Sequence, residues 1–405
     1  MKNVRLRVLL GVKTGLVCGA TASAGPLFPP AGPPESTDKP LTEVEPRIAI
    51  NSVNTPGDAD SRYRITQRGS YYLTRDLGIS LVRHGIEIAS DNVTIDLMGF
   101  TLFSADPLPI GSPPVSLDGI HGDLSGGTSF YNNITIRNGV IRGFGEDGID
   151  IRGRNCRFEN LQLYDNRGKG LETFSSSVVV NCQAFQSGGN GFEASSSTVF
   201  LNCTAEDNSG HGFDVGQFGS TIGCTADNND GSGFVTSKGA RVVDCAAFSQ
   251  PIGFDMGSGS VITGCAAAFN SVGVNARVIG SEEGTIITEC AVTASSIGYS
   301  VQDSCYLLNS IADNCTNAGI RVTGSGNRIE GNHAIGTFLE GFEVSGVGNL
   351  IVRNTANNNG TDYLIAVGNR YGPIVDISAG GALGVNGSSA AGTLGTTDPW
   401  ANFSH

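Results

Sequence analysis

The chain of 405 residues contains 58 glycines, only 16% charged residues and a formal net charge of −13. This charge excludes nucleic acid as a partner, because phosphate binding needs a clustered basic surface and the chain has no run of lysine and arginine. No later stretch approaches the roughly 18 consecutive apolar residues of a spanning helix, so we expect no transmembrane segment. A repeat array can nevertheless form a single domain of this length.

The first 24 residues have the composition of an export signal. Basic residues precede an apolar run at 8–12, and Ala22 and Ala24 offer a small-residue cleavage site. We therefore interpret residues 1–24 as a signal peptide. The protein is expected to be exported, with an extracellular, cell-surface or periplasmic location.

Four further segments follow the signal peptide. Residues 25–44 are rich in proline, which does not support helix or sheet ladders, so they are interpreted as an extended linker. Residues 45–80 are expected to form an entry cap, because the first turn of a repeat array otherwise exposes an unpaired sheet edge. Residues 81–370 contain the repeats, and residues 371–405 form a tail rich in glycine and serine.

The repeats are marked by a glycine followed by a bulky apolar residue at a nearly constant step. Successive glycines lie 20 to 25 residues apart. They are Gly148, Gly170, Gly191, Gly212, Gly233, Gly253, Gly273, Gly298, Gly319 and Gly341. Such a period indicates a solenoid, in which each repeat buries its apolar residues against its neighbours.

Within each repeat the apolar runs are short and rich in β-branched residues, as in Val178–Val180 and Val199–Leu201. Runs of this kind, bounded by Gly, Asn, Asp and Ser, favour strands. No repeat contains the amphipathic stretch that a helix needs, and the regular leucines of leucine-rich repeats are missing. The pattern therefore predicts an all-β, single-stranded parallel β-helix with turns of about 21 residues.

Two sets of residues are expected to stack in the interior of this coil. Phe192, Phe213, Phe234 and Phe254 follow successive repeat glycines. Six cysteines keep the same step, and we expect them to form an inward column of mostly free thiols. They are Cys182, Cys203, Cys224, Cys245, Cys265 and Cys290. Cys305 and Cys315 lie outside this column, and a disulfide between them stays open as an alternative.

The chain resembles bacterial exported right-handed parallel β-helix repeat proteins of the pectin-lyase-like superfamily. The resemblance is carried by residues 92–97 (NVTIDL), 133–139 (NITIRNG) and 65–74 (ITQRGSYYLT), and by the repeated Asn/Asp–Gly–aromatic units. It covers roughly residues 45–370 and implies a right-handed coil. Over residues 80–370 we expect roughly twelve or thirteen turns of this coil. The superfamily includes lyases, hydrolases, epimerases and adhesins, so the resemblance is specific for fold and not for activity.

An acidic residue often stands two places after the repeat glycine. Strand alternation turns it outward, so Asp150, Glu172, Glu193 and Asp214 should form an acidic stripe over four consecutive turns. Mutual repulsion would attract a cation, and calcium at these four residues is one hypothesis. Ligand binding at Glu172, Glu193, Asp214 and Asp255 is a second. The alternative is a solvated face of a very acidic protein.

Catalytic candidates on this stripe are Asp150, Arg152 and Glu172. Asp150 and Arg152 are two residues apart and should face the same way. In lyases of the resembled superfamily, carboxylates hold calcium and a basic residue abstracts a sugar proton, which this group could imitate. A surface salt bridge is the alternative reading.

Two segments place a histidine where it could carry chemistry. Gly210-His211-Gly212 is similar to a signature of β-helix pectin hydrolases, but it falls on the repeat's own turn and the accompanying motifs are absent. Asp118, His121 and Asp123 lie in the early irregular repeats, where a metal site or an irregular loop would both fit.

The sequence thus predicts an exported, monomeric β-helix that binds polysaccharide along a lateral face, without a demonstrable catalytic motif. Two alternatives remain: a polysaccharide lyase or glycoside hydrolase acting on that face, and a structural or adhesive cell-envelope protein whose partner is a cell-surface component. No cofactor other than calcium is suggested.

Overall fold

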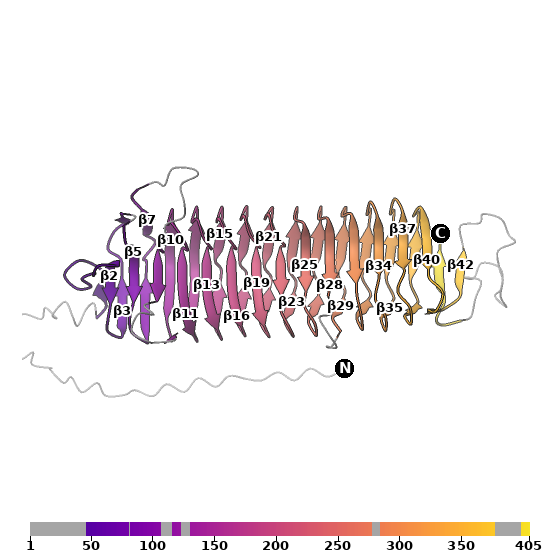
Figure 1. Cartoon of the computed structure of the whole chain (residues 1–405), viewed down its shortest axis with the longest axis horizontal. Helices are drawn as coiled ribbons and strands as arrows, with labels where there is room; N and C mark the ends of the chain where they lie inside the picture. Colours follow the sequence, from indigo (N-terminus) through magenta and orange to yellow (C-terminus); the bar gives the residue numbers. More distant parts are fainter. Residues whose placement is uncertain (1–45, 81, 107–115, 123–129, 278–283, 377–397) are drawn as a thin grey trace, which may run out of the picture. The chain divides into compact units, whose positions relative to one another are not determined.

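A computed structural model describes residues 46–80, 82–106, 116–122, 130–277, 284–376 and 398–405. From residue 47 onward, the described residues form one elongated coil whose axis runs from β2 to β42 (Figure 1). Every regular element in the described part is a β-strand, and the strands of successive turns pair in parallel. The predicted signal peptide and linker lie outside the described residues.

The coil has three faces, and most turns carry one strand on each of them. Face 1 is a 15-stranded sheet. Its strands are β2 (Ser61–Ile65), β5 (His84–Ile88), β8 (Ile120–Gly122), β9 (Tyr131–Asn132), β11 (Ile149–Arg154), β13 (Leu171–Ser175), β16 (Phe192–Ser196), β19 (Phe213–Gln217), β22 (Phe234–Thr236), β25 (Ile252–Met256), β28 (Val272–Ala276), β31 (Ile297–Val301), β34 (Ala318–Val322), β37 (Glu340–Val344) and β40 (Thr361–Ile365).

Faces 2 and 3 form a single 28-stranded sheet, because the long strands β10 and β12 bend through both. Face 2 contains β1 (Ile48–Ala49), β3 (Gly69–Tyr72), β6 (Val93–Asp96), β10 (Thr135–Arg142), β12 (Arg157–Tyr164), β14 (Val178–Val180), β17 (Val199–Leu201), β20 (Ser220–Ile222), β23 (Arg241–Val243), β26 (Val261–Thr263), β29 (Ile286–Thr288), β32 (Tyr306–Leu308), β35 (Arg328–Glu330), β38 (Leu350–Val352) and β41 (Arg370–Tyr371).

Face 3 begins with β4 (Leu77–Ile79) and β7 (Thr101–Ser104), continues through the second halves of β10 and β12, and ends with β42, which pairs with β43. Its other strands are β15 (Gln183–Phe185), β18 (Thr204–Glu206), β21 (Thr225–Asp227), β24 (Ala246–Phe248), β27 (Ala266–Ala268), β30 (Ala291–Thr293), β33 (Ile311–Asp313), β36 (His333–Ile335), β39 (Thr355–Asn357), β42 (Ile374–Asp376) and β43 (Asn402–Ser404).

The parallel ladder is longer than the repeat pattern alone indicates. Strands β1 to β4 lie in the segment expected to be a cap, yet they pair in parallel with β3, β5, β6 and β7. At the other end, β43 lies in the predicted tail and pairs with β39. The path from β2 to β40 gives fourteen turns, because the first turn forms inside the predicted cap.

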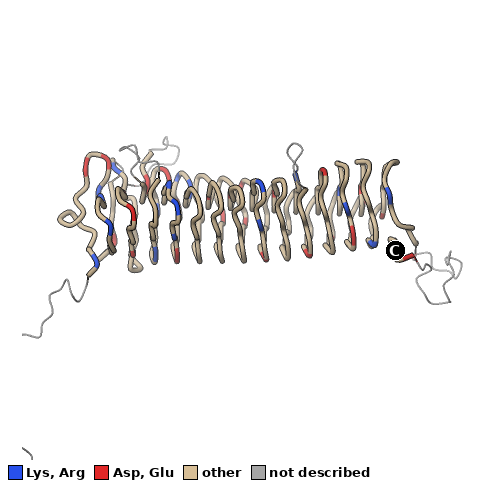
Figure 2. The backbone as a smooth tube through the Cα atoms, turned by 90° about the horizontal axis from the view of Figure 1, so that it is seen from below, with Lys and Arg blue, Asp and Glu red and all other residues tan. Residues whose placement is uncertain are grey.

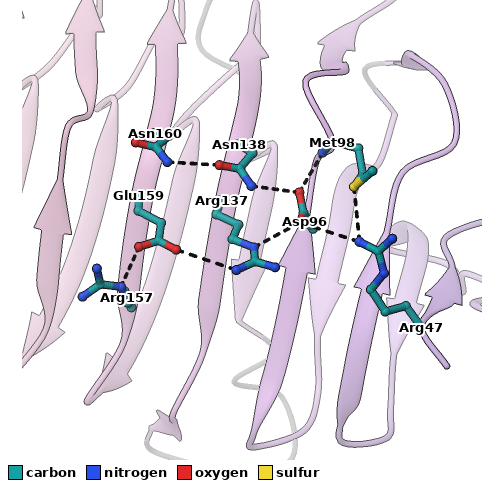
Figure 3. A network of polar contacts seen from close by, with 8 residues as sticks. All are labelled: Arg47, Asp96, Met98, Arg137, Asn138, Arg157, Glu159 and Asn160. Carbon is teal, nitrogen blue, oxygen red and sulfur yellow. Dashed lines mark hydrogen bonds and ion pairs between the residues drawn. The ribbon is translucent and has the colours of Figure 1, made fainter. Parts of the chain in front are cut away.

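Left-handed backbone conformations allow the chain to bend sharply between faces. In one turn, Ser197, Asn202 and Asp207 have φ of 51°, 52° and 54°. Asn, Asp and Gly tolerate this region best, which explains their recurrence at the corners. On the outside of one corner, the Asn160 side chain donates to Asn138, which donates to Asp96 (Figure 3). These side-chain contacts link neighbouring turns along the outside of the coil.

The interior consists of stacked columns. Phe192, Phe213, Phe234 and Phe254 are fully buried, and their successive ring centroids lie 5.1, 4.8 and 4.9 Å apart. This confirms the predicted phenylalanine stack. Rings at this separation bury a large apolar area at every turn.

The six expected cysteines are buried and free, which confirms the inward column. Within it, the backbone N–H of Cys203 donates to Cys224 Sγ at 3.4 Å. Cys305 and Cys315 are also buried and free, so the structure contains no disulfide between them.

Further along the coil, asparagines replace the cysteines at the same interior position. The backbone N–H of Ser310 donates to Asn332 Oδ1, that of Asn332 to Asn354 Oδ1, and that of Asn354 to Asn402 Oδ1, each at 2.9 Å. Each buried amide thus satisfies a backbone group of the adjacent turn.

Candidate active site on face 1

The predicted acidic stripe exists. Asp150 is in register with Glu172, Glu172 with Glu193, and Glu193 with Asp214, on β11, β13, β16 and β19. Each follows an inward apolar residue, so all four face out from face 1. The same register continues through Val235 to Asp255 and ends near Glu343. We call these six acidic residues the acidic column.

A lysine that the sequence pattern did not single out separates two of these carboxylates. Lys169 Nζ lies 2.6 Å from Glu172 Oε2 and 2.7 Å from Glu193 Oε1. Burial opposes the charge of this ammonium, but its hydrogen bonds to Glu172 and Glu193 and their charges raise the pKa of Lys169 above its ordinary value. Lys169 therefore supplies, between these two residues, the positive charge that was expected from a cation.

A further acidic residue, Asp147, lies beside the acidic column in the corner before β11. Asp147 stands directly before the repeat glycine and is only 6% exposed. Its Oδ1 accepts the backbone N–H of Lys169 at 2.6 Å, and its own N–H donates to Asp118 Oδ1 at 2.9 Å. Carboxylate oxygens of Asp147, Asp150 and Glu172 all lie within 4.8 Å of one another. We call these three residues the carboxylate trio.

Two members of the carboxylate trio hold their protons unusually tightly. Burial, with the nearby charges of Asp118, Asp150 and Glu172, raises the pKa of Asp147 to about 8, although the Lys169 amide opposes the shift. Burial and the charge of Glu172 raise the pKa of Asp150 to about 7, although Arg152 and Lys169 oppose the shift. Both groups therefore exchange protons near neutral pH, as acid–base catalysts do.

Asp150 has a further property that sets it apart. Its Oδ1 is buried and has no hydrogen-bond partner among the described residues. An ionised oxygen in that position would be poorly solvated, whereas a protonated carboxyl group would carry less cost. Burial and the charge of Glu193 also raise the pKa of Asp214, which lies three strands further along face 1.

The carboxylate trio also fits a hard divalent cation. Three carboxyl groups offer oxygen ligands of the kind that calcium prefers, and their separation is compatible with a shared ion. This set overlaps the predicted calcium residues at Asp150 and Glu172 and adds Asp147. A cation and the protons of Asp147 and Asp150 would compete for the same oxygens.

Next to the carboxylate trio, face 1 carries an aromatic and cationic surface. Phe174 lies two residues after Glu172 and is half-buried, and its ring centroid is 4.5 Å from that of Phe130. The Arg154 guanidinium lies 4.2 Å from the Phe130 centroid and 6.0 Å from that of Phe174. Arg152 is exposed on the same strand as Asp150. Aromatic rings of this kind offer a flat apolar surface beside polar groups.

The early histidine site differs from the sequence prediction. His121 lies with His84 and Asp118, while Asp123 is outside the described residues. The two imidazole rings stack with centroids 3.8 Å apart and planes inclined by 21°. His84 Nδ1 accepts the backbone N–H of Asp118 at 2.9 Å. A metal lies in the plane of each imidazole ligand, so nearly parallel stacked rings do not suit a shared ion.

His211 has a corner role. The His211 Nδ1 atom accepts a hydrogen bond from the backbone N–H of Ser232 at 2.9 Å. The backbone N–H of His211 donates to Asn190 Oδ1 at 2.8 Å. It occupies the same position in its repeat as Lys169 and Asp147, one residue before the glycine. The likeness to a hydrolase signature therefore coincides with a repeated structural hydrogen bond.

Sequence reasoning missed five residues of this region. Asp147 and Lys169 could have been found from their place before the repeat glycine, because the neighbouring residues at that place are also polar. Phe130, Arg154 and Phe174 had no such signal, since they come together only through the register of β9, β11 and β13.

Among the residues that the structure describes, none forms a helix of the length and apolarity that a membrane span requires. Residues 118–247 match the family model described as a right-handed β-helix region. No curated protein matches the chain significantly in sequence.

Several solved structures are similar in fold. The A-module of an Azotobacter vinelandii mannuronan C-5 epimerase is 15% identical, with 75% of this chain and 90% of that chain covered and a TM-score of 0.41. A pectate lyase is 18% identical, with 66% of this chain and 69% of that chain covered and a TM-score of 0.38. The tailspike protein of E. coli bacteriophage HK620, solved in complex with a pentasaccharide, is 10% identical. The match covers 83% of this chain and 72% of that chain, with a TM-score of 0.46.

At these identities the similarity concerns the fold alone. The parallel register of all three faces and the family match over residues 118–247 agree with the resemblance found in the repeats. The described part of the chain is a right-handed parallel β-helix.

Proposed function

We propose that the protein binds a polysaccharide across the outer surface of face 1 and cleaves it there by general acid–base catalysis. The observation that carries this proposal is the carboxylate trio, in which Asp150 exchanges its proton near pH 7 at less than 4.8 Å from another carboxyl group. The proposal includes export of the protein, because residues 1–24 have the composition of a signal peptide.

The two half-buried members of the trio, Asp150 and Glu172, have different environments, which suits different roles. Asp150 combines a pKa of about 7 with a buried, unpartnered oxygen, so it is the proton donor to the glycosidic oxygen. Glu172 is held by the Lys169 ammonium at 2.6 Å and acts as the carboxylate that attacks the anomeric carbon. Carboxyl groups about 5 Å apart are typical of retaining glycoside hydrolases, in which water then releases the sugar.

Binding would extend along face 1 from the carboxylate trio. Phe130, Arg154 and Phe174 provide a surface for sugar rings on adjacent strands. Glu193 and Asp214 continue the acidic column in the other direction, which disfavours a polyanionic chain. A neutral polysaccharide is therefore the expected substrate class.

One observation favours a second candidate, a calcium-dependent polysaccharide lyase. The carboxylate trio can hold a cation, and Arg152 lies exposed on the strand that carries Asp150. A bound cation would displace the protons from Asp147 and Asp150 and reduce the repulsion of acidic sugars. The two candidates differ in their need for calcium and in their products.

The test is an assay of neutral and acidic polysaccharides with either a chelator or millimolar Ca²⁺. New reducing ends from a neutral polysaccharide in the presence of chelator support the hydrolase, with activity falling above pH 7 as Asp150 ionises. Unsaturated products that appear only with Ca²⁺ overturn it in favour of the lyase. Retention of polysaccharide without any product overturns catalysis and leaves binding alone.

Variants make the assignment specific. Asp150→Asn and Glu172→Gln should each lower activity by at least roughly 100-fold, the usual contribution of a catalytic proton donor or nucleophile. Glu343→Gln is the matched control, because Glu343 lies in the same acidic column many turns away and pairs with Arg321. Equal losses in all three variants would contradict the proposed site.

A further inference from the structure

The C-terminal end of face 2 has a cavity that the proposed function does not use. Its volume is about 350 Å³, at the small end of the range for ligand pockets. Arg328, Leu350 and Arg370 contribute to its wall from β35, β38 and β41, where they are in register on neighbouring turns. Tyr371 and Trp400 complete the part of the wall used below.

The segment that carries Trp400 is fastened to the coil. Arg353 Nε donates to the backbone oxygen of Pro399 at 2.9 Å, and its guanidinium lies 4.3 Å from the centroid of the Trp400 ring. Asp398 Oδ1 accepts the backbone N–H of Trp400 at 2.8 Å. The wall on this side is therefore built by specific contacts rather than by a loose chain end.

The lining combines apolar and cationic groups. Trp400 is 45% exposed and Tyr371 is 54% exposed, so both rings retain accessible surface although they line a cavity. Two guanidinium groups face the same space, and Asp398 is the acidic residue of the lining. Arg328 Nε donates to Glu330 at 2.6 Å, which fixes its position. The lining thus contains two arginines and one aspartate, on a chain with a formal charge of −13.

These features select a ligand with a carboxylate and an apolar face. Arginine binds carboxylates through paired, charge-assisted hydrogen bonds. Tryptophan and tyrosine present flat surfaces against which the C–H face of a sugar ring packs. We propose that this cavity is a binding site for a carboxylate-bearing saccharide, with Arg328 and Arg370 contacting the carboxylates and Trp400 and Tyr371 contacting the ring.

This site is independent of the carboxylate trio. It lies on face 2 at β35 to β41, whereas the trio lies on face 1 at β11 and β13 near the other end of the coil (Figure 1). The charge of the two sites is opposite, so the expected ligands differ as well. Failure of either proposal leaves the other unaffected.

Trp400 is the single tryptophan of the chain, so its fluorescence reports on the cavity directly. The experiment titrates the full chain with a galacturonic acid trimer and, separately, with the neutral trisaccharide maltotriose. We expect a saturable change of Trp400 fluorescence with the acidic trimer and a much weaker response to maltotriose. No saturable change, or equal affinities for both, overturns the proposal.

Arg370→Gln should weaken binding of the acidic trimer by roughly tenfold, because a charge-assisted hydrogen bond is lost. Arg241→Gln is the matched control, since Arg241 occupies the same outward position on face 2 but lies on β23, outside the cavity. Unchanged affinity in Arg370→Gln, or equal weakening in both variants, contradicts the assignment. Asp150→Asn should respond as the unmodified protein does, which separates this site from face 1.

Discussion

The N-terminal and C-terminal halves of the acidic column follow the same sequence rule but differ in charge balance. In the C-terminal half, Asp255 lies 2.6 Å from Arg277, and Glu343 lies 2.5 Å from Arg321. In the N-terminal half, Asp150 has a buried oxygen without a hydrogen-bond partner among the described residues, and its pKa is raised to about 7. Equal register therefore does not give equal chemistry.

The origin of the difference lies in the corners and neighbouring strands. Around the carboxylate trio, Asp118 and Asp147 add acidic groups from the corner before face 1, and Lys169 is already engaged by Glu172 and Glu193. Figure 2 shows that acidic and basic residues occur more densely over the first turns than over the middle ones. A surplus of buried acidic groups raises the pKa of the carboxyl groups among them, whereas a paired cation opposes that rise.

The largest expected effect is on the pH dependence of folding. The pKa values of Asp147 and Asp150 are raised in the folded state, so folding favours their protonated forms. Stability from these groups is full below about pH 4 and is lost as pH rises through about 7 and 8. The free energy of unfolding should fall by on the order of 5 kcal/mol over this range. Denaturant unfolding between pH 4 and pH 9 measures it, and a flat profile would contradict the two shifts.

Asp150→Asn should reverse part of this loss. The amide cannot ionise, so the variant should be more stable than the unmodified protein by about 2–4 kcal/mol at pH 8 and of similar stability at pH 4. Melting temperatures at the two pH values give the comparison. A variant destabilised equally at both would show that Asp150 is ionised and paired in the native state.

Lys169→Met should destabilise the protein, because Glu172 and Glu193 then face each other without the ammonium. The expected cost is about 1–2 kcal/mol, since all three side chains are about a quarter exposed and solvent screens part of the interaction. Lys169→Arg keeps the charge and serves as the control. Equal stability of the two variants would mean that the positive charge between the carboxylates is dispensable.

The smallest effect is expected from Glu343→Gln, in the balanced half. Loss of the half-buried pair with Arg321 should cost about 0.5–1 kcal/mol at neutral pH. The sign is therefore opposite to that of Asp150→Asn at pH 8. A double-mutant cycle with Arg321→Met isolates the pair, and stabilisation by Glu343→Gln would remove the contrast between the halves.

The repeat pattern determines the fold because residues one repeat apart pair in register on neighbouring turns, so each repeated position forms a column along the coil. From the glycine step alone, Phe192 and Cys224 could be assigned to interior stacks, and Glu172 and Glu193 to neighbouring outward positions. The step says nothing about burial at a corner, so the raised pKa of Asp147 could not be predicted from it.

The cavity at the C-terminal end was equally inaccessible to sequence reasoning. Trp400 lies in a segment that the sequence indicates only as part of a tail rich in glycine and serine. Its place depends on the return of β43 to β39 and on the contact with Arg353, both of which join residues far apart in the sequence. No local period encodes such contacts.

The interior asparagine column has a direction, and this affects how the chain is completed during synthesis. The amide of Ser310 is capped by Asn332, and that of Asn332 by Asn354, so each turn depends on the one made after it. A growing chain always ends in a turn with an uncapped buried amide. Asn402 ends this sequence for Asn354 across 48 residues. Removal of residues 398–405 would leave the buried amide of Asn354 without its acceptor, so the turns beside it should fray.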